Sequence, residues 1–356
     1  MKKKILIVGQ GIAGTVLTFT LIGKEDLEIT ILDNNPQTSS SKVAAGLYNP
    51  IVFKRLMHSW NANEVIPKLK EFYSKIEILL NTSFHFTMPL LKILSNEEEK
   101  QFWLKKSKQV EMWDYISQDI LKSYKPDFIN QHSGFAEVFN AGFVDLKVFL
   151  VQAREYFVGL NIYIQSYFDY SELKIENNAT VYKKQNYDYI IFAEGYNSLN
   201  NPYFKWLPFV PAKGEVLTLK IPNYDSDKIV NKNLFVLPLG NDLYKVGATY
   251  NWLNLNEEVT EVAKIELLEK LKDVLKCDFE LINQEAGIRP SILDRRPIIG
   301  AHPSEKSLLI FNGLGTKGVM LAPFVAESLS EFILKGVEIE SEINVSRFYK
   351  FYPNGR

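Results

Sequence analysis

The N-terminal segment has the hydrophobic pattern of a strand, a tight turn, a helix and a second strand. Residues 4–8 (KILIV) form a short apolar run, which predicts a fully buried strand. A glycine turn (GQGIAG, 9–14) follows, and residues 12–23 are apolar on nearly every face, so we predict a buried helix. Residues 28–32 (EITIL) predict a second strand that ends at Asp33. Together these elements predict a βαβ unit.

A related pattern returns near the C-terminus. Residues 307–312 (SLLIFN) predict a strand, residues 313–318 (GLGTKG) a second glycine turn, and residues 319–334 a long apolar helix. Between the two ends, residues 187–195 (YDYIIFAEG) predict a buried strand that stops at a glycine. Three stretches with alternating apolar positions predict antiparallel strands: 215–221, 234–238 and 244–249. Helices are predicted for 63–80, for the segment capped by Asp145, and for 261–275.

This order predicts an α/β protein in which both chain ends build one domain. We expect a Rossmann-like nucleotide-binding domain that is discontinuous in sequence, and a second, α+β domain with a mainly antiparallel sheet. The length of 356 residues agrees with two domains. We assign residues 1–83, 141–205 and 286–356 to the nucleotide-binding domain, and residues 84–140 and 206–285 to a substrate domain.

Composition and charge exclude several classes of protein. The 41 basic and 42 acidic residues give a net charge of −1, which is unusual for a protein that grips a long nucleic acid. The obvious basic runs are Lys2–Lys4 and Lys105–Lys108, and both are compatible with solvated faces. No window reaches the ~20 apolar residues of a membrane helix. We therefore expect a soluble, cytoplasmic protein without a membrane partner; the sequence predicts no oligomeric state.

Metal and disulfide chemistry are not expected. The single cysteine, Cys277, excludes an intramolecular disulfide and a cysteine-rich zinc site. No two of the four histidines stand at metal-ligand spacing.

The first glycine turn carries the pattern of a dinucleotide site. Gly9 permits a tight turn, Gly11 allows the backbone to approach a pyrophosphate, and Gly14 allows the helix to pack on the strand. The helix N-terminus offers amide groups to the phosphates. Asp33 would bind a ribose, and its charge would repel the 2′-phosphate of NADP. The alternative is a turn that serves only to pack a helix on a strand.

The second glycine turn is open to two interpretations. GLGTKG places amide groups and a helix N-terminus where negative charge develops on a reduced flavin. It is equally compatible with an ordinary start of a structural helix.

Several segments together resemble one family, the D-amino-acid-oxidase-like FAD-dependent oxidoreductases. This family includes glycine oxidase, sarcosine oxidase and the oxidase half of a bifunctional tRNA methylaminomethyluridine enzyme. The resemblance runs from Lys3 to about Leu334 and is sparse in 84–140. It is carried, in family order, by GQGIAG with Asp33, AAGLYNP, YDYIIFAEG, KGEVLTL, VGATY, AGIRPSILDRRPIIG and GLGTKGVMLAPFVAESL.

The resemblance implies a two-domain enzyme that binds FAD. Because the C-terminal flavin segment has no cysteine, the FAD is expected to be non-covalent. Gly9, Gly11 and Gly14 would hold the pyrophosphate, and Asp33 the adenosine ribose. The remaining residues that it places beside the cofactor are Ser41, Ala44, Ala45, Gly46, Glu194, Gly195, Gly300, Gly313, Gly315, Lys317 and Gly318.

The resemblance also implies catalytic residues. Arg289 aligns with the arginine that holds the substrate carboxylate in amino-acid-oxidising members, although an ion-paired structural arginine is the alternative. Tyr250 would line the substrate face or pack in the core. Lys317 would favour flavin reduction or face solvent. The substrate pocket would be shaped by 84–140 and 251–260.

The function implied is oxidation of the C–N bond of a small amine or amino acid, by hydride transfer to flavin N5. One alternative is a tRNA-modifying oxidase that acts on carboxymethylaminomethyluridine, because GLGTKG is closer to the GLGSRG of that enzyme than to the glycine-oxidase turn. Another alternative is a non-catalytic FAD-binding protein. An NAD-dependent dehydrogenase would differ from all of these by being colourless.

Overall fold

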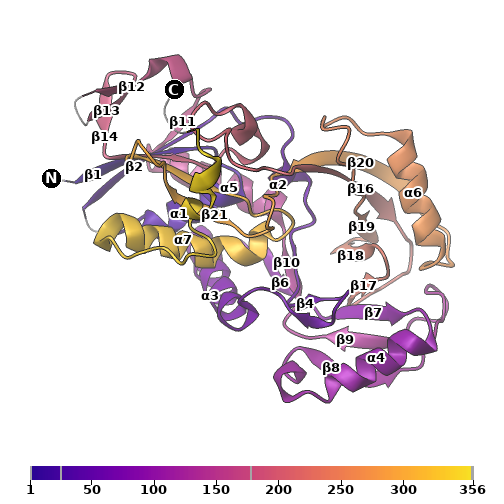
Figure 1. Ribbon diagram of the computed structural model, residues 1–356. Helices are drawn as coiled ribbons and strands as arrows, with labels where there is room; N and C mark the ends of the chain where they lie inside the picture. Colours follow the sequence, from indigo (N-terminus) through magenta and orange to yellow (C-terminus); the bar gives the residue numbers. More distant parts are fainter. Residues whose placement is uncertain (1, 25, 177–178, 354–356) are drawn as a thin grey trace.

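The computed structural model describes residues 2–24, 26–176 and 179–353 (Figure 1). A six-stranded sheet has the order β11-β2-β1-β15-β22-β21, and all its strands are parallel except β21. Its strands are β1 (Lys3–Val8), β2 (Leu27–Asp33), β11 (Tyr163–Gln165), β15 (Tyr189–Phe192), β21 (Ile298–Ala301) and β22 (Leu308–Asn312). In the described ranges, no helix is both long and apolar enough to cross a membrane.

Both faces of this sheet are covered, which explains why its central strands are apolar without alternation. Ile5 and Ile7 of β1 pack among the helices, whereas Leu6 and Val8 pack on the opposite side. The helices are α1 (Ile12–Leu21), α2 (Ser40–Val43), α3 (Ala62–Leu80), α5 (Leu146–Gly159) and α7 (Gly318–Lys335). The opposite side is covered by β12 (Leu173–Glu176), β13 (Ala179–Tyr182) and β14 (Gln185–Tyr187), which form an antiparallel sheet, together with segments that include Phe204 and Phe348.

A second, eight-stranded sheet has the order β20-β16-β19-β18-β17-β7-β9-β8. It is antiparallel except where β17 pairs with β7, and in Figure 1 it curves from β20 and β16 at the upper right to β8 at the lower right. Its strands are β7 (Leu90–Leu94), β8 (Ile116–Leu121), β9 (Gly134–Val138), β16 (Ala212–Lys220), β17 (Ile229–Asn231), β18 (Phe235–Gly240), β19 (Leu243–Gly247) and β20 (Glu280–Arg289). The helices α4 (Glu97–Ser107) and α6 (Glu261–Lys272) pack against it.

Short strands lie between the two large sheets. They are β3 (Leu47–Tyr48), β6 (His85–Thr87) and β10 (Gly142–Val144) in one small sheet, and β4 (Ile51–Val52) with β5 (Met57–His58) in another. The expected fold class, an α/β domain with a mainly antiparallel partner sheet, is therefore confirmed.

Two local expectations differ from the structure. The apolar run predicted as one strand over 187–195 is divided between β14 and β15, and residues after Phe192 turn toward the cavity described below. The second difference concerns residue 286, where we expected the nucleotide-binding domain to begin again. Strand β20 runs past this residue, because it pairs with β16 as far as Arg289. We propose that the two large sheets mark the two domains, with the end of β20 on the substrate side.

Candidate active site

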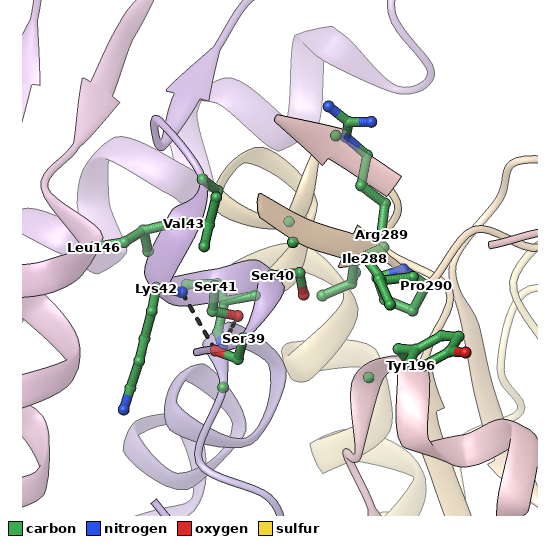
Figure 2. A pocket seen from close by; sticks show the side chains of 18 of the residues that line it. Ser39, Ser40, Ser41, Lys42, Val43, Leu146, Tyr196, Ile288, Arg289 and Pro290 are labelled. Atoms are coloured by element: carbon green, nitrogen blue, oxygen red, sulfur yellow. Dashed lines mark hydrogen bonds between the residues drawn. The ribbon is translucent and has the colours of Figure 1, made fainter. Parts of the chain in front are cut away.

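A large cavity lies between the carboxyl ends of β1 and β2 and one face of the eight-stranded sheet. Its volume of about 1300 Å³ exceeds the ~300–1,000 Å³ of ordinary drug-sized sites, so it has room for a dinucleotide and a small second ligand. Figure 2 shows residues of α2 and the end of β20, including Ser41 and Arg289, around this cavity.

At one end, the N-terminus of α1 opens into the cavity. Gly11 caps this helix and, as a glycine, supplies no side-chain acceptor to its first turn. The amide of Ile12 donates to Ser41 Oγ at 3.0 Å, and the amide of Gln10 donates to Asp33 Oδ2 at 2.9 Å. The free helix end, its positive dipole and the absence of side chains at the glycines fit the pyrophosphate of a dinucleotide.

The close approach of α1 to β1 depends on two glycines. Gly9 has φ = +103°, and a Cβ there would lie 2.6 Å from the carbonyl oxygen of Ala193. A Cβ at Gly14 would clash with the carbonyl oxygen of Gly9. Gly14 does not line the cavity itself, so its role is to set the position of the turn.

We therefore expect Gly14→Ala to lower both stability and cofactor content. Overpacking of this kind costs roughly 1–3 kcal/mol, and here the obstructing atom belongs to the turn that receives the phosphates. The bound flavin per mole of purified protein and the urea midpoint measure the two effects. Gly159→Ala is the control, because a Cβ there meets nothing within 4 Å. Equal flavin content in the two variants would contradict the assignment.

Charged side chains that the sequence analysis did not identify surround Asp33. Asp33 Oδ1 accepts from the amide of Asn35 at 2.6 Å. Lys42 of α2 lies nearby, and its pKa is lowered by burial and by Arg154, with Asp33 opposing the shift. Arg154 of α5 donates from Nε to Gln10 Oε1 at 2.9 Å. Arg154 comes from a distant helix, so no local motif indicates it.

The end of β15 contributes Glu194 and Gly195 to the cavity wall. Burial raises the pKa of Glu194, while hydrogen bonds from Tyr170 Oη and Asn201 Nδ2 act in the opposite direction. The carbonyl of Gly195 accepts from Asn312 Nδ2 at 2.8 Å, which ties β15 to β22. This is a polar and partly enclosed wall, suited to hydroxyl or amide groups of a nucleoside.

The loop through α2 forms the central wall. Ser41, Ala44, Ala45 and Gly46 all line the cavity. Ser39 caps α2, with its Oγ accepting from the Lys42 amide at 3.3 Å (Figure 2). Gly46 has φ = +67°, and a Cβ there would clash with the carbonyl oxygen of Val144.

The C-terminal glycine turn contributes only part of what was expected. Gly315 and Gly318 line the cavity, whereas Gly300, Gly313 and Lys317 do not. A Cβ at Gly300 would meet Val345, and one at Gly313 would meet Ile298, so both glycines serve packing. Lys317 donates from Nζ to Ser59 Oγ at 2.9 Å, and its pKa is lowered by burial and by Arg296.

Arg289 stands at the end of β20, where it lines the cavity from the eight-stranded sheet. Its Nη1 donates to the carbonyl oxygen of Thr249 at 3.1 Å and to that of Lys213 at 3.4 Å. Its guanidinium lies 4.3 Å from the ring centroid of Tyr250. A side chain at Gly214 would collide with this guanidinium, so the glycine makes room for it.

No carboxylate neutralises Arg289 in the part of the chain that the structure describes: its recorded partners are carbonyl oxygens and an aromatic ring. Burial lowers the pKa of Arg289, but a guanidinium remains charged at physiological pH. A partly buried cation without an acid, on the wall of a cavity, is suited to bind a carboxylate from a ligand.

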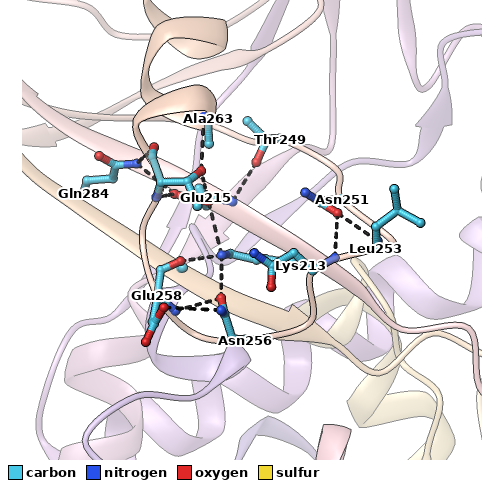
Figure 3. Close-up of polar contacts among 12 residues, drawn as sticks. Lys213, Glu215, Thr249, Asn251, Leu253, Asn256, Glu258, Ala263 and Gln284 are labelled. Carbon is cyan, nitrogen blue, oxygen red and sulfur yellow. Dashed lines mark hydrogen bonds and ion pairs between the residues drawn. The ribbon is translucent and has the colours of Figure 1, made fainter.

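Two buried, oppositely charged side chains of β16 hold the segment that follows Tyr250 by hydrogen bonds (Figure 3). Lys213 Nζ lies 3.5 Å from Glu215 Oε1, and both side chains are almost fully buried, at 1% and 3% exposure. Lys213 Nζ also donates to Asn256 Oδ1 at 2.9 Å and to the carbonyl oxygen of Glu258. Glu215 accepts from the Thr260 amide and hydroxyl, both at 2.8 Å.

This pair lies on the side of β16 away from the cavity, because Gly214 and Val216 face inward. Leu255, Asn256 and Glu257 of the fastened segment line the cavity. Residues 251–260 thus contribute to its wall, whereas 84–140 contributes Lys92.

Comparison with known proteins gives the class. The family model described as FAD dependent oxidoreductase matches residues 4–332, and the chain belongs to this family. Its cofactor is therefore FAD, and the open N-terminus of α1 with the glycine cradle fits the diphosphate of that group.

The similar curated proteins include two types of enzyme. The chain is 30% identical over 129 residues to glycine oxidase from Bacillus licheniformis, which covers 35% of each chain. It is 26% identical over 130 residues to the tRNA 5-methylaminomethyl-2-thiouridine biosynthesis bifunctional protein of Campylobacter jejuni, covering 36% of this chain and 21% of that one. The matched segments thus span well under half of these relatives.

Solved structures share the whole fold. Iminodiacetate oxidase from Chelativorans sp. BNC1 superimposes with a TM-score of 0.78 at 18% identity, covering 95% of this chain and 98% of that one. Glycine oxidase from Bacillus cereus ATCC 14579 gives 0.77 at 20% identity, covering 95% and 96%. At these identities the likeness concerns the fold.

Proposed function

We propose that this protein oxidises the C–N bond of an amine that carries a carboxylate. The observation that carries the proposal is Arg289, a cation on the wall of the cavity that no acid of the described chain neutralises. A planar guanidinium binds a carboxylate with two parallel hydrogen bonds, so it fixes both position and orientation. Its hydrogen bonds to the carbonyl oxygens of Thr249 and Lys213 both come from Nη1, so we assign Nη2 and Nε to the substrate carboxylate.

The chain's own residues would orient the substrate. Arg289 holds the carboxylate, and Tyr250 lies against the guanidinium and restricts its movement. FAD, when bound, would supply a two-electron oxidant for the Cα hydride. The amine oriented by these residues would lose that hydride, and water would hydrolyse the resulting iminium ion. No side-chain base is needed if the amine enters deprotonated, because orientation alone then brings the reacting atoms together.

The start of α7 would assist this reaction electrostatically. Gly315, Thr316 and Gly318 line the cavity, and Lys317 caps the helix without a side-chain hydrogen bond. The amide groups and the positive helix end would stabilise the negative charge that a flavin bound there gains on reduction. Lys317 is held at Ser59, so we assign this role to the backbone rather than to its ammonium group.

Anaerobic mixing of the purified holoprotein with a panel of amines tests the proposal. We expect bleaching of the flavin absorbance with carboxylated secondary or primary amines, and slower or no bleaching with the same amines lacking the carboxylate. A yellow protein that no amine bleaches would instead support a non-catalytic FAD-binding protein.

A second candidate function is oxidation of a carboxymethylaminomethyl group on tRNA. The similarity to the bifunctional tRNA-modifying protein favours it, as do two exposed aromatic rings beside Arg289. Tyr250 and Trp252 stack with centroids 5.9 Å apart and could receive a nucleobase. In the first basic run, Lys4 pairs with Glu28 and Lys3 donates to the carbonyl of Ile333. Lack of tRNA binding at low salt would remove this candidate.

A further inference from the structure

A row of residues crosses the eight-stranded sheet in register along the cavity. Lys92 on β7 is paired with Asn231 on β17, and Asn231 with Phe235 on β18. Phe235 is paired with Gly247 on β19, and Gly247 with Val216 on β16. All five line the cavity, and Arg289 lines it from the next strand, β20. On β20 the residue in register with Val216 is Glu285, and Arg289 stands four residues further along that strand, in register with Ala212. The cavity therefore has one cationic side chain at the β7 end of the row and a second one on β20, beyond the other end.

Lys92 resembles Arg289 in that no acid of the described residues neutralises its charge. Within residues 2–24, 26–176 and 179–353, no carboxylate lies within 4.0 Å of its ammonium group, in contrast to Lys228 or Lys245 of the same sheet, which pair with acids. Its Nζ lies 5.8 Å from the ring centroid of Phe53. Burial lowers its pKa, while the more distant Glu99 raises it and Lys232 lowers it.

The surroundings of Lys92 are polar and open outward. Lys54, Asn231 and Asn233 also line this end of the cavity, and Lys54 and Asn233 are exposed. Two ammonium groups and two side-chain amides, which all donate hydrogen bonds, are suited to the oxygens of a carboxylate or a phosphate.

The two cationic ends are too far apart for the smallest amino acids. From β7 to β20 there are five strand spacings, about 24 Å along the curved sheet. Phe235, Gly247 and Val216 stand between Lys92 and Arg289. A glycine-sized ligand held at Arg289 would leave Lys92 untouched, whereas a long ligand would lie across the row.

We propose that Lys92, with Lys54, Asn231 and Asn233, forms a second anion subsite for the far end of an elongated substrate. The ligand class is a carboxymethylamine whose other nitrogen substituent is long and ends in a carboxylate or phosphate. The orientation of this ligand rests on the proposed function, because we take the carboxylate of its carboxymethyl group to lie at Arg289. Either a free amine with two carboxylates or a nucleotide would supply the anionic group for the subsite at Lys92.

Binding to the holoprotein tests the subsite. Carboxymethylamines with alkyl chains of increasing length are prepared with three endings: carboxylate, phosphate and methyl. Dissociation constants are measured by anaerobic calorimetry, and flavin reduction is followed separately. At the best chain length, we expect an anionic ending to tighten binding on the order of tenfold over methyl. A preference for phosphate over carboxylate would indicate a nucleotide as the source, and the reverse a dicarboxylic amine.

Variants assign the effect to Lys92. Lys92→Met is expected to abolish the advantage of the anionic ending and leave the methyl-ended ligand within twofold, and Lys92→Arg to restore most of it. Lys105→Met, at an exposed lysine of α4, serves as control. Flavin content and the urea midpoint report whether each variant is folded.

The outcomes separate the two proposals. An equal affinity for anionic and methyl endings, or an anionic advantage that Lys92→Met leaves unchanged, would overturn the subsite. Binding without any flavin reduction would leave the subsite supported and contradict the proposed oxidation. If the ligands with all three endings reduced the flavin and bound with equal affinity, the result would support the proposed oxidation and overturn the subsite.

Discussion

Replacement of Arg289 by methionine is expected to lower kcat/KM for carboxylated amines by ~2–5 kcal/mol of transition-state stabilisation, which is roughly a 30- to 4,000-fold loss. The reason is that the substrate carboxylate would enter a partly buried wall whose cation has been removed, while no other residue of the described chain takes its place beside Tyr250. Steady-state kinetics and the anaerobic rate of flavin reduction measure the loss.

The sharpest control for this prediction is the substrate rather than a second variant. An amine that lacks the carboxylate should react with the wild-type protein and with Arg289→Met at similar rates, because it gains nothing from the guanidinium. Arg289→Lys keeps the charge without the planar donor pair, and we expect it to recover only part of the loss. Unchanged kinetics in Arg289→Met would remove this residue from the mechanism.

Lys213→Met is expected to destabilise the folded holoprotein by ~3–5 kcal/mol. The substitution leaves the Glu215 carboxylate buried without its cation, and it removes one donor each from Asn256 Oδ1 and from the carbonyl oxygen of Glu258. Urea unfolding followed by circular dichroism measures the change. Because the same contacts hold the segment that carries Tyr250, we also expect a raised KM for carboxylated amines.

An exposed ion pair provides the matched comparison. Lys75 pairs with Glu71 on the surface of α3, with side-chain exposures of 70% and 64%. Lys75→Met should cost no more than ~0.5 kcal/mol, since surface pairs of this kind contribute little. If Lys213→Met and Lys75→Met were equally stable, the buried pair would not be what fastens residues 249–260. The double variant Lys213→Met/Glu215→Gln then gives the coupling energy between the two side chains.

The fold was largely accessible from the sequence because its main signals are local. The apolar run at residues 5–8 is buried on both faces of a parallel sheet, so it could not be mistaken for an alternating surface strand. Gly14 is required by a contact with the carbonyl oxygen of Gly9, five residues earlier in the same turn, so this constraint is local in the sequence. The antiparallel pairing of β18 with β19 follows from the turn at Gly240 and Asn241, both with positive φ.

The candidate site was accessible only in part. Glycine is called for at any tight turn, so the pattern at 313–318 could not separate Gly315 and Gly318, which line the cavity, from Gly313, which packs on Ile298. The position of Lys317 in the second glycine turn predicted that it would lie beside the cofactor. Its long side chain instead donates a hydrogen bond to Ser59, which is far away in the sequence. Arg154 and Lys92 belong to no motif, and only the packing of α5 and β7 brings them to the cavity.

The sequence by itself determined the glycine cradle, the order of the elements, the fold class and the resemblance that implies FAD, because each of these depends on residues close together along the chain. The tertiary structure alone decided that Arg289 has no acidic partner among residues 2–24, 26–176 and 179–353, that Lys213 and Glu215 fasten residues 249–260, and that Lys92 stands in one row with Val216. Those facts depend on strand register and on which side chains meet across the sheet. A shift of one residue in any pairing would turn the same side chains to the opposite face.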